Sequence, residues 1–464
     1  MNGGKQPTRT WYAGIDLARI MFVASLCMMA FVYGVATMQY RLFPYGVIMD
    51  ARSAYKALRS EEDDALFAGV IVLDPKAAAK PVVATLDPEA GTEYLLVTGG
   101  PFQFMQRCPK YGCMAWIIDR KGNVLHSWEV DTDQLFGDLP KLSGRPFIRN
   151  MYPSGVALDR DGSLVMVFQA RNAFPAQVGI AKVDRNGKLL WKRWDQNHHW
   201  PIVDRDGTIY APYMYLAHNL EYFGHTPIES RCPSGQVKLE GIAIYDHDGK
   251  PKRRIDISKH LISSNYPGLL YSLRDGCDPI HLNWIEVVNA SAAAKIPGVD
   301  AGDLLVSLRE SGTIGIIDKD SGEFKRQYTG RTAGQHSPRF LPDGTLLVFD
   351  NKGGDRAQGG SRIVKLDLAT GAVETVFPRP GETRQLPFFS DVAGHIDVSA
   401  DGRRALITVK SGRSFEIDIA TGRPLWSYVS NFDIAPYLKL QGINAKTSRA
   451  TQKLWDVDYC RLPE

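Results

Sequence analysis

Four of the ten histidines in this 464-residue chain stand in similar settings, each just before or at the start of a short strand-like run. They are His199 in QNHHWPI, His281 in DPIHLNWI, His336 in QHSPRF and His395 in VAGHIDV. Grouped imidazoles, with a guanidinium from Arg339 or Arg362, would form a cationic, donor-rich site that suits an oxyanion such as sulfate, phosphate or carboxylate. A metal is less suited, because no trio of Asp, Glu and His has close ligand spacing. We expect no metal and no cofactor.

The most informative of these settings is QHSPRFLPDGTLLVFDN, residues 335–351. The Pro-Asp-Gly triplet in its middle predicts a hairpin turn, since proline presets φ and glycine accepts a positive φ. The TLLVF run that follows predicts a buried strand. His336 and Arg339 therefore lie on one side of a β-hairpin, and Asn351 lies at its far end.

Turns of the same kind recur along the chain and set the predicted architecture. They are Asp119–Gly122, Asp159–Gly162, Asp184–Gly187, Asp204–Gly207, Asp246–Gly249, Asp318–Gly322, Asp367–Gly371, Asp401–Gly402 and Asp418–Gly422. Very apolar strands, as after Gly162, alternate with amphipathic ones, as after Gly187. Inner hydrophobic hairpins alternating with amphipathic outer ones are what a propeller blade requires. The sequence therefore predicts an all-β fold, a six-bladed β-propeller, in which the four histidines converge on one central channel.

The N-terminus differs from the rest of the chain. Ile20 to Met38 forms a run of 19 residues without a charge, about enough to cross a bilayer. Lys5, Arg9 and Arg19 precede it, which favours a cytoplasmic N-terminus. A cleaved signal peptide is the competing interpretation, but its apolar region would be unusually long. We expect a retained N-terminal transmembrane helix, with the bulk of the chain facing an oxidising compartment.

These observations predict four segments. They are a cytoplasmic tail and transmembrane anchor at 1–40, a juxtamembrane segment at 41–93, the β-propeller at 94–440 and a C-terminal extension at 441–464. Five of the six cysteines lie outside the anchor, an odd number, so at least one stays free or pairs with another chain. Cys108–Cys113 and Cys232–Cys277 are the expected disulfides. The net charge of +4, without a long Lys/Arg run, gives no support for nucleic-acid binding.

Three segments resemble the bacterial arylsulfotransferase family. DPIHLN at 278–283 is similar to its His-x-Asn segment, residues 335–351 to its second histidine segment with the Phe-Asp-Asn end, and SRIVKLD at 361–367 to its Ser-Arg segment. The resemblance covers residues 95–440. It implies a six-bladed propeller that moves a sulfuryl group from a phenolic sulfate ester to another phenol, without a nucleotide sulfate donor or a metal. A histidine is the covalent acceptor in the family, which is ordinary nucleophilic catalysis.

The resemblance also implies roles for individual residues. His281 and His336 would bind the sulfuryl oxygens or protonate the departing phenolate, and Arg362 would neutralise charge. The nucleophile of the family follows the Ser-Arg segment, and here only His395 does so. His395 is thus the fourth candidate catalytic residue, although it precedes the turn after which the family nucleophile is expected. The candidate substrate-binding residues are His199, Asn283, Arg339 and Asn351.

The expected function is therefore that of a membrane-anchored arylsulfotransferase-like protein, single-pass in a bacterial inner membrane and largely periplasmic. Its expected partners are an aryl sulfate donor, a phenolic or other hydroxyl acceptor and the membrane, with a protein partner or a homo-oligomer left open. The alternative is a non-catalytic propeller that binds a ligand or protein at the membrane surface. A quinone-dependent dehydrogenase is a third interpretation, but it would need repeated tryptophan docking motifs and a calcium site, which nine scattered tryptophans do not supply.

Overall fold

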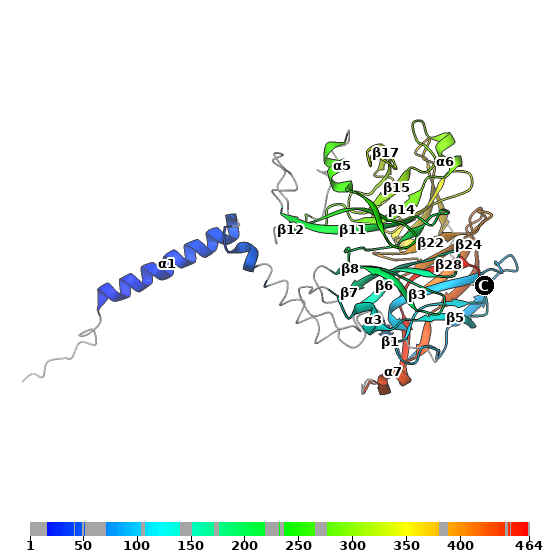
Figure 1. Ribbon diagram of the computed structural model, residues 1–464, viewed down its shortest axis with the longest axis horizontal. Helices are drawn as coiled ribbons and strands as arrows, with labels where there is room; N and C mark the ends of the chain where they lie inside the picture. The colour runs from blue at the N-terminus through cyan, green and yellow to red at the C-terminus, as the bar shows by residue number, and fades with distance from the viewer. Residues whose placement is uncertain are drawn as a thin grey trace, which may run out of the picture.

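The structure, a computed structural model, consists of an N-terminal helix and a body of β-sheets (Figure 1). It describes residues 16–40, 42–48, 51, 71–103, 107–139, 151–170, 176–218, 232, 236–264, 276–379, 388–440, 444–445 and 447–462. Most of residues 41–70, the greater part of the predicted juxtamembrane segment, lies outside this description.

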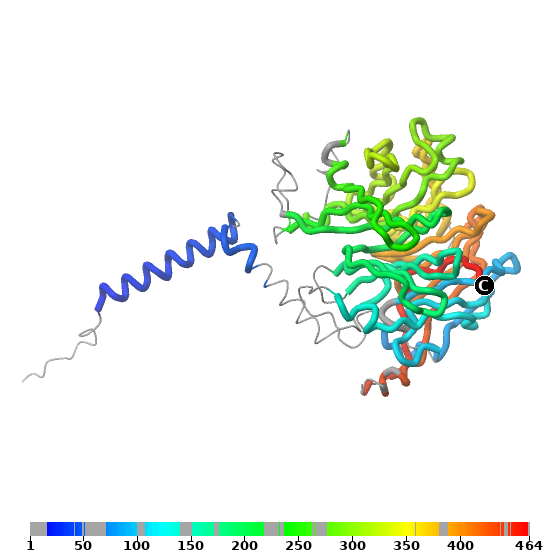
Figure 2. Tube along the Cα trace, in the orientation of Figure 1, coloured from blue at the N-terminus to red at the C-terminus, as the bar shows by residue number. Residues whose placement is uncertain are grey.

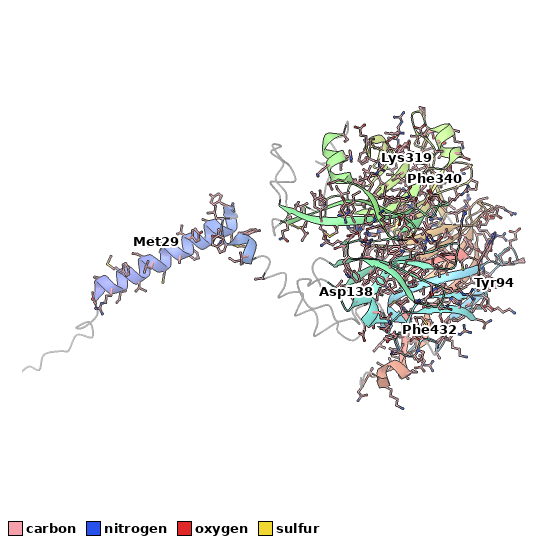
Figure 3. All side chains as sticks on the ribbon, in the orientation of Figure 1. Met29, Tyr94, Asp138, Lys319, Phe340 and Phe432 are labelled. Atoms are coloured by element: carbon pink, nitrogen blue, oxygen red, sulfur yellow. A yellow bond between two sulfur atoms is a disulfide. The ribbon has the colours of Figure 1, made fainter. Side chains whose placement is uncertain are left out.

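The N-terminal helix α1 (Leu17–Tyr40) projects away from the sheets (Figure 1). Its side chains are almost all exposed; Met29, for example, is 60% exposed and touches no neighbouring element in Figure 3. Burying so many apolar side chains in a lipid core would remove them from water. By length and composition the helix can cross a membrane, although a signal sequence passes the same test.

The described strands form seven sheets, all paired antiparallel, and six of these have four or five strands. In the first, β28 (Leu454–Cys460) pairs with β3 (Tyr94–Gln103), β4 (Cys113–Ile118) and β5 (Val124–Glu129) in that order. The second contains β6 (Met151–Leu158), β7 (Leu164–Ala170), β8 (Gln177–Val183) and β9 (Leu189–Arg193). The third contains β10 (Ile202–Val203), β11 (Ile209–His218), β12 (Gln236–Tyr245) and β13 (Pro251–Ile255).

The remaining large sheets continue the same pattern along the chain. The fourth contains β14 (Leu282–Val287), β15 (Leu304–Leu308), β16 (Thr313–Ile317) and β17 (Phe324–Thr329). The fifth contains β18 (His336–Phe340), β19 (Leu346–Asp350), β20 (Arg362–Leu366) and β21 (Val373–Phe377). The sixth contains β22 (His395–Val398), β23 (Arg404–Val409), β24 (Arg413–Asp418), β25 (Pro424–Val429) and β2 (Val82–Thr85).

Smaller elements complete the fold. A three-stranded sheet joins β1 (Ile71–Leu73), β27 (Arg449–Gln452) and β26 (Asn431–Asp433). Short helices occupy connections between strands: α3 (Thr132–Phe136), α5 (Ile257–Ser263), α6 (Ala290–Lys295), the 3₁₀ turn η3 (Arg356–Gln358) and α7 (Ala435–Leu440).

The expected alternation of strand types is confirmed, and with it the all-β class. All five residues of β19 are buried, whereas β9, on the outer edge of its sheet, is mostly half-buried. The turn before β7 shows why the Asp-Gly pattern works: Gly162 adopts φ +79°, and its N–H donates to the carbonyl oxygen of Asp159 at 3.1 Å.

The first strand of each large sheet contacts its counterpart, or the strand beside it, in the next sheet. β28 contacts β6, β6 contacts β10, β11 contacts β14, β14 contacts β18, β18 contacts β22, and β22 contacts β28. The chain colours in Figure 2 follow this order, and the red C-terminal strand lies back among the first cyan strands. The strands that carry the four histidine settings therefore lie next to one another.

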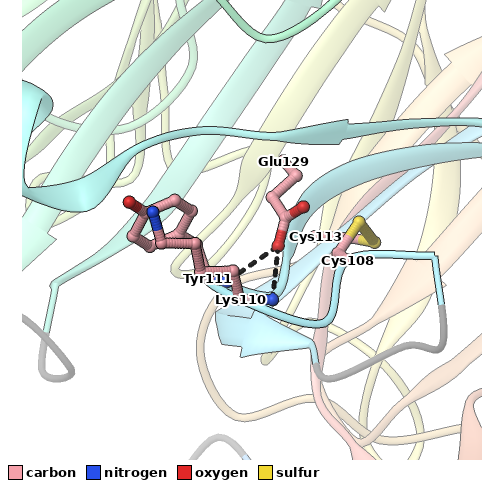
Figure 4. Close-up of a disulfide and its surroundings, with 5 residues drawn as sticks. All are labelled: Cys108, Lys110, Tyr111, Cys113 and Glu129. Carbon is pink, nitrogen blue, oxygen red and sulfur yellow. Dashed lines mark hydrogen bonds between the residues drawn. A yellow bond between two sulfur atoms is a disulfide. The ribbon is translucent and has the colours of Figure 1, made fainter.

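Both expected disulfides are confirmed, between Cys108 and Cys113 and between Cys232 and Cys277. The first closes a short loop whose backbone is also held by Glu129 (Figure 4). The N–H groups of Lys110 and Tyr111 each donate to one carboxylate oxygen of Glu129 at 2.8 Å. Cys27 and Cys460 are free thiols.

A buried carboxylate ties the two ends of the sheet body together. Glu416 of β24 is fully buried and accepts hydrogen bonds from Tyr459 of β28 at 2.8 Å, Arg120 at 3.0 Å and the N–H of Gly91 at 2.9 Å. Arg404 stands 3.4 Å away. The cluster therefore links the sixth sheet to the first sheet and to the chain that leads into it.

Replacing Glu416 with Gln should destabilise the body, because a buried charge is removed from two guanidinium partners. We expect the free energy of unfolding to fall by about 3 kcal/mol, the scale of a broken buried ion pair. The matched control is Glu374→Gln on the exposed side of β21. Urea unfolding would contradict this role of Glu416 if both variants had the midpoint of the unmodified protein.

Candidate active site

All four histidine settings place an imidazole where a large sheet begins. His395 opens β22, and the other three lie close together. His281 directly precedes β14, His336 opens β18, and His199 lies just before β10. The backbone is strained there: φ is +56° at His199, +52° at His281 and +46° at Ser337. Non-glycine residues rarely adopt this conformation, and such strain gathers at ligand sites and active sites.

These rings form one group, which we call the histidine cluster: His198, His199, His281 and His336. The Nδ1 atoms of His198 and His199 lie 2.6 Å apart. The rings of His199 and His281 meet edge to face, with centroids 5.0 Å apart. Burial lowers the pKa of His336 to about 3, and the nearby charge of His281 acts in the same direction. The structure thus brings together three of the predicted residues and adds His198.

Asn351 fixes the tautomer of His336. The amide nitrogen of Asn351 donates to the carbonyl oxygens of Ser390 at 2.8 Å and Ala393 at 2.6 Å, so its Oδ1 must face His336. His336 Nδ1 lies 2.8 Å from that oxygen and is therefore the protonated nitrogen. Its Nε2 keeps a lone pair and acts as an acceptor, not as the donor to sulfuryl oxygens that the resemblance implied.

His281 has a different partner, a carboxylate. Its Nδ1 lies 2.7 Å from Asp278 Oδ2, and Lys238 Nζ stands 3.5 Å from the same oxygen. Burial alone would raise the pKa of Asp278, but the positive charges of His281 and Lys238 outweigh it and hold that pKa well below its usual range. Because an ionised carboxylate only accepts, Nδ1 of His281 is the nitrogen that carries hydrogen.

Arg309 lies beside this cluster, and its guanidinium is ion-paired with the carboxylate of Glu310, 2.8 Å from Nε. It follows β15, whose last residue pairs with the first residue of β14, and its N–H donates to the carbonyl oxygen of His281 at 3.1 Å. Its positive charge helps to lower the pKa of His199, after burial and the neighbouring histidines, and the pKa of His336. Sequence reasoning missed Arg309; its place at the end of the strand that pairs with β14 was the available signal.

The two predicted arginines are engaged elsewhere. Arg362 donates from Nε to Asp350 at 2.8 Å, directly across the β19–β20 pair. Arg339 lies 2.9 Å from Asp397 and 3.5 Å from Glu286. Among the described residues, none of their hydrogen bonds or ion pairs reaches the histidine cluster. The geometry gives no support to a charge-neutralising role for Arg362.

Asn283, the remaining predicted polar residue, is fully buried and connects two strand entrances. Its amide nitrogen donates to the carbonyl oxygen of Gln335, next to His336, at 2.7 Å. Its Oδ1 has no partner among the described residues. Asn283 therefore holds the start of β14 against the start of β18 and so positions His281 relative to His336.

His395 lies behind a pair of tryptophans. Its ring centroid is 5.3 Å from that of Trp200 and 5.4 Å from that of Trp284. Its Nε2 lies 2.6 Å from Asp458 Oδ1. Burial would lower the pKa of His395, but the Asp458 carboxylate outweighs this and raises it. No ring contact within the described ranges joins His395 to the histidine cluster, since Trp200 is the residue that contacts both His199 and His395.

One group of potential metal ligands occurs among the described residues, away from the histidines: Asp159, Asp161 and His247. Lys182 already supplies a cation there, with its Nζ 2.8 Å from Asp159 Oδ2 and 2.7 Å from His247 Nε2. An ammonium group among these atoms satisfies the buried carboxylate of Asp159, so the group is a salt-bridge cluster.

Comparison with known proteins identifies a family for the chain. The sequence profile described as arylsulfotransferase (ASST) matches residues 161–431, more than half of the chain. No curated protein matches the chain.

Solved structures show weak similarity. A protein of unknown function from Bacteroides caccae is 12% identical with a TM-score of 0.46, covering 79% of this chain and 98% of its own. Virginiamycin B lyase from Staphylococcus aureus is 12% identical with a TM-score of 0.36, covering 74% of this chain and 86% of its own. The Dos1 propeller is 14% identical with a TM-score of 0.37, covering 76% of this chain and 73% of its own. We draw nothing about activity from these low scores.

The buried neutral state of His336 predicts acid sensitivity. Below the ordinary pKa of 6.5 the unfolded chain takes up a proton at this residue, whereas the folded chain does so only near pH 3. Stability is therefore lost as the pH falls through this window. In His336→Gln the slope of unfolding free energy against pH should decrease there by about 1.4 kcal/mol per unit.

The control for this measurement is His395→Gln. Because the pKa of His395 is raised, its contribution to stability is present at low pH and is lost as the pH rises above 6.5. The two variants should therefore change the stability curve on opposite sides of that value. Equal slopes for His336→Gln and the unmodified protein between pH 4 and 6 would rule out a buried neutral His336.

Proposed function

Because the chain belongs to the arylsulfotransferase family, we propose that it transfers a sulfuryl group from an aryl sulfate ester to a phenolic or other hydroxyl acceptor. The observation that carries this proposal is the pairing of His281 with Asp278 at 2.7 Å inside a cluster of imidazoles. This arrangement provides a nitrogen nucleophile whose positive charge after reaction is compensated.

His281 is the covalent acceptor in this proposal. Its Nδ1–H is held by Asp278, which leaves the Nε2 lone pair to attack the sulfur atom. The N–S bond forms as the bond from sulfur to the aryl oxygen breaks, and the imidazole ring then carries a positive charge. The carboxylate behind Nδ1 stabilises that charge, as the amide partner of His336 cannot. His395 is not the nucleophile here, because tryptophans separate it from the cluster.

Arg309 assists this transfer by its charge, and the tautomer of His336 limits what that ring can do. Negative charge accumulates on the departing aryl oxygen and the sulfuryl oxygens, and a guanidinium placed there lowers the barrier. His336 Nε2, an acceptor by its tautomer, supplies no proton to this step. In the second half-reaction the oxygen of the incoming hydroxyl attacks sulfur and the N–S bond breaks. The hydroxyl proton passes to a neutral imidazole of the cluster, and His281 is regenerated.

The fold supports the proposal by bringing the strand entrances together. We propose that the six large sheets are blades of one closed six-bladed propeller, with β28 closing the ring against β3 and the histidine cluster lining its channel. This propeller corresponds to the predicted 94–440 segment with β28 added from the C-terminal extension. We also propose that α1 is a retained anchor in a bacterial inner membrane, with the disulfide-bonded body on the periplasmic side.

Turnover and trapping test the covalent histidine. The purified full chain in detergent, given 4-nitrophenyl sulfate and phenol, should release 4-nitrophenol. His281→Ala should lower kcat/KM by on the order of 10⁴-fold, the scale of losing a nucleophile. Quenched enzyme without acceptor should carry one SO₃ group on the peptide containing His281, detected by mass spectrometry. His395→Gln is the control and should keep the modification.

The outcomes separate the interpretations. A sulfated His395 or His336 in place of His281 would overturn the assignment of the nucleophile while leaving the activity in place. An absence of turnover with every donor, with retained binding of an aryl sulfate or a protein, would favour the non-catalytic propeller.

The two arginines offer a second test. Arg309→Gln should lower kcat/KM by about 10²- to 10³-fold, because a preorganised charge is lost from the transition state. Arg362→Gln should instead lower the thermal midpoint, since it leaves the buried Asp350 carboxylate without its 2.8 Å partner, and should retain most of its activity below that midpoint. The reverse pattern would restore Arg362 to the site.

A further inference from the structure

A chain of buried titratable groups continues from the histidine cluster into the third sheet. Glu240 of β12 is 2% exposed, and its Oε1 lies 3.5 Å from Nε2 of His198. His198 Nδ1 lies 2.6 Å from His199 Nδ1, and the His199 ring contacts His281. The contacts therefore run from a buried carboxyl group through two imidazoles to the proposed nucleophile.

The positions of the protons in this chain follow from the distances between its members and from their burial. Two like nitrogens at 2.6 Å must share one proton, so exactly one of the two Nδ1 atoms carries hydrogen. Burial raises the pKa of Glu240 well above its ordinary value, and the negative charge of Asp278 adds to this effect. Burial likewise lowers the pKa of His198 to about 3. The resting state thus holds a protonated Glu240 next to two neutral imidazoles.

We propose that Glu240, His198 and His199 form a proton relay that protonates the departing aryl oxygen and later takes the proton of the incoming hydroxyl. The relay rests on the proposed sulfuryl transfer and deepens it. With this relay the full exchange neither releases nor takes up a proton. The proton given to the leaving phenol in the first half-reaction is recovered from the acceptor in the second.

The transfer balances atom by atom. At rest Glu240 Oε1–H faces His198 Nε2, His198 Nδ1–H donates to His199 Nδ1, and His199 Nε2–H faces the substrate. As the bond from sulfur to oxygen breaks, His199 Nε2–H moves to the leaving oxygen, His198 Nδ1–H moves to His199 Nδ1, and the Glu240 proton moves to His198 Nε2. Glu240 is left as a carboxylate, and attack by the acceptor hydroxyl reverses each step.

A hydrogen-bond donor and nearby positive charges stabilise the ionised state of Glu240. The N–H of Leu282, which opens β14, donates to its other oxygen, Oε2. The charges of Lys238 and Arg309 also favour the carboxylate, although less strongly than burial and Asp278 oppose it. The main chain of Tyr213 and the charge of His281 face His198. The 3.5 Å gap between Glu240 and His198 is longer than a hydrogen bond, and such contacts tighten when substrate binds.

The test uses a series of aryl sulfates whose phenols differ in pKa, with the full chain in detergent. Glu240→Gln keeps the shape and the acceptor for the Leu282 N–H but cannot supply a proton. For unsubstituted phenyl sulfate, whose leaving group needs the proton, kcat/KM should fall by about 10²-fold, the scale of general acid catalysis. For 4-nitrophenyl sulfate, whose phenolate leaves without help, it should fall by less than about threefold. A merely structural role would lower both alike.

Glu286→Gln is the matched control. Glu286 is a half-buried carboxyl whose pKa is also raised by desolvation, but it lies beside Arg339 and Trp284, away from the histidine cluster. It should leave the dependence on the leaving group unchanged. His198→Asn should reproduce the effect of Glu240→Gln, and the double variant should be no worse than either single one, because the two residues act in one chain.

An infrared readout is independent of turnover. The unmodified protein at neutral pH should show the C=O stretch of a carboxylic acid that is absent in Glu240→Gln. An equal loss for all leaving groups, or no difference in the carboxylic-acid band, would overturn the relay. If the unmodified protein turns over no aryl sulfate at all, the proposed function fails; turnover that Glu240→Gln leaves unchanged removes the relay alone.

Discussion

The shared burial of the histidine rings is the constraint on which the rest of the site depends. A charged imidazole is costly away from water, and a second one beside it is costlier. Burial lowers the pKa of His198, His199 and His336, so these rings stay neutral. Each neutral ring has one donor and one acceptor nitrogen, and its partners decide which is which. His281, backed by a carboxylate, is the ring of the cluster best suited to carry positive charge.

The fold brings these rings together by placing the first residues of several sheets side by side. His199, His281 and His336 come from three sheets that are far apart in the sequence, and no single hairpin could hold them within contact distance. Buried polar side chains fix the relative positions of these strands. Asn283, for example, connects β14 to the residue before His336. The cost is left-handed backbone at His199 and His281, which packing against neighbouring strands must offset. The Glu416 cluster, which joins the last sheet to the first, therefore supports the site from a distance.

Much of the fold could be predicted because its signals are local. Asp-Gly turns and apolar runs identify the hairpins, and histidines at equivalent places before strands identify the site. Partner choice across strands is not local. Arg362 faces Asp350 because of the β19–β20 register, whereas Arg309 reaches the cluster because β15 ends opposite the start of β14. Glu240 gave no signal at all, since it lies inside an apolar strand and depends on β14 for its hydrogen-bond donor. The contributions of β1, β2 and β28 were missed for the same reason. These strands pair with partners far away in the sequence, and such pairing produces no local sequence pattern.

The two tryptophans separate two polar groups, the histidine cluster and the His395–Asp458 pair. A sulfuryl group on a histidine is as open to water as to a phenol, so transfer requires that water be excluded from the reacting side. Trp200 and Trp284, 2% and 1% exposed, pack on each other and form an apolar floor between His395 and the cluster, where Trp200 contacts His199. His395, paired with Asp458 on the other side, and Asp456, which accepts from Trp200 Nε1 at 2.9 Å, hold that floor in place. On this view His395 acts through the tryptophans and not on the sulfur atom. That accounts for a histidine that opens β22 yet makes no ring contact with the histidine cluster among the described residues.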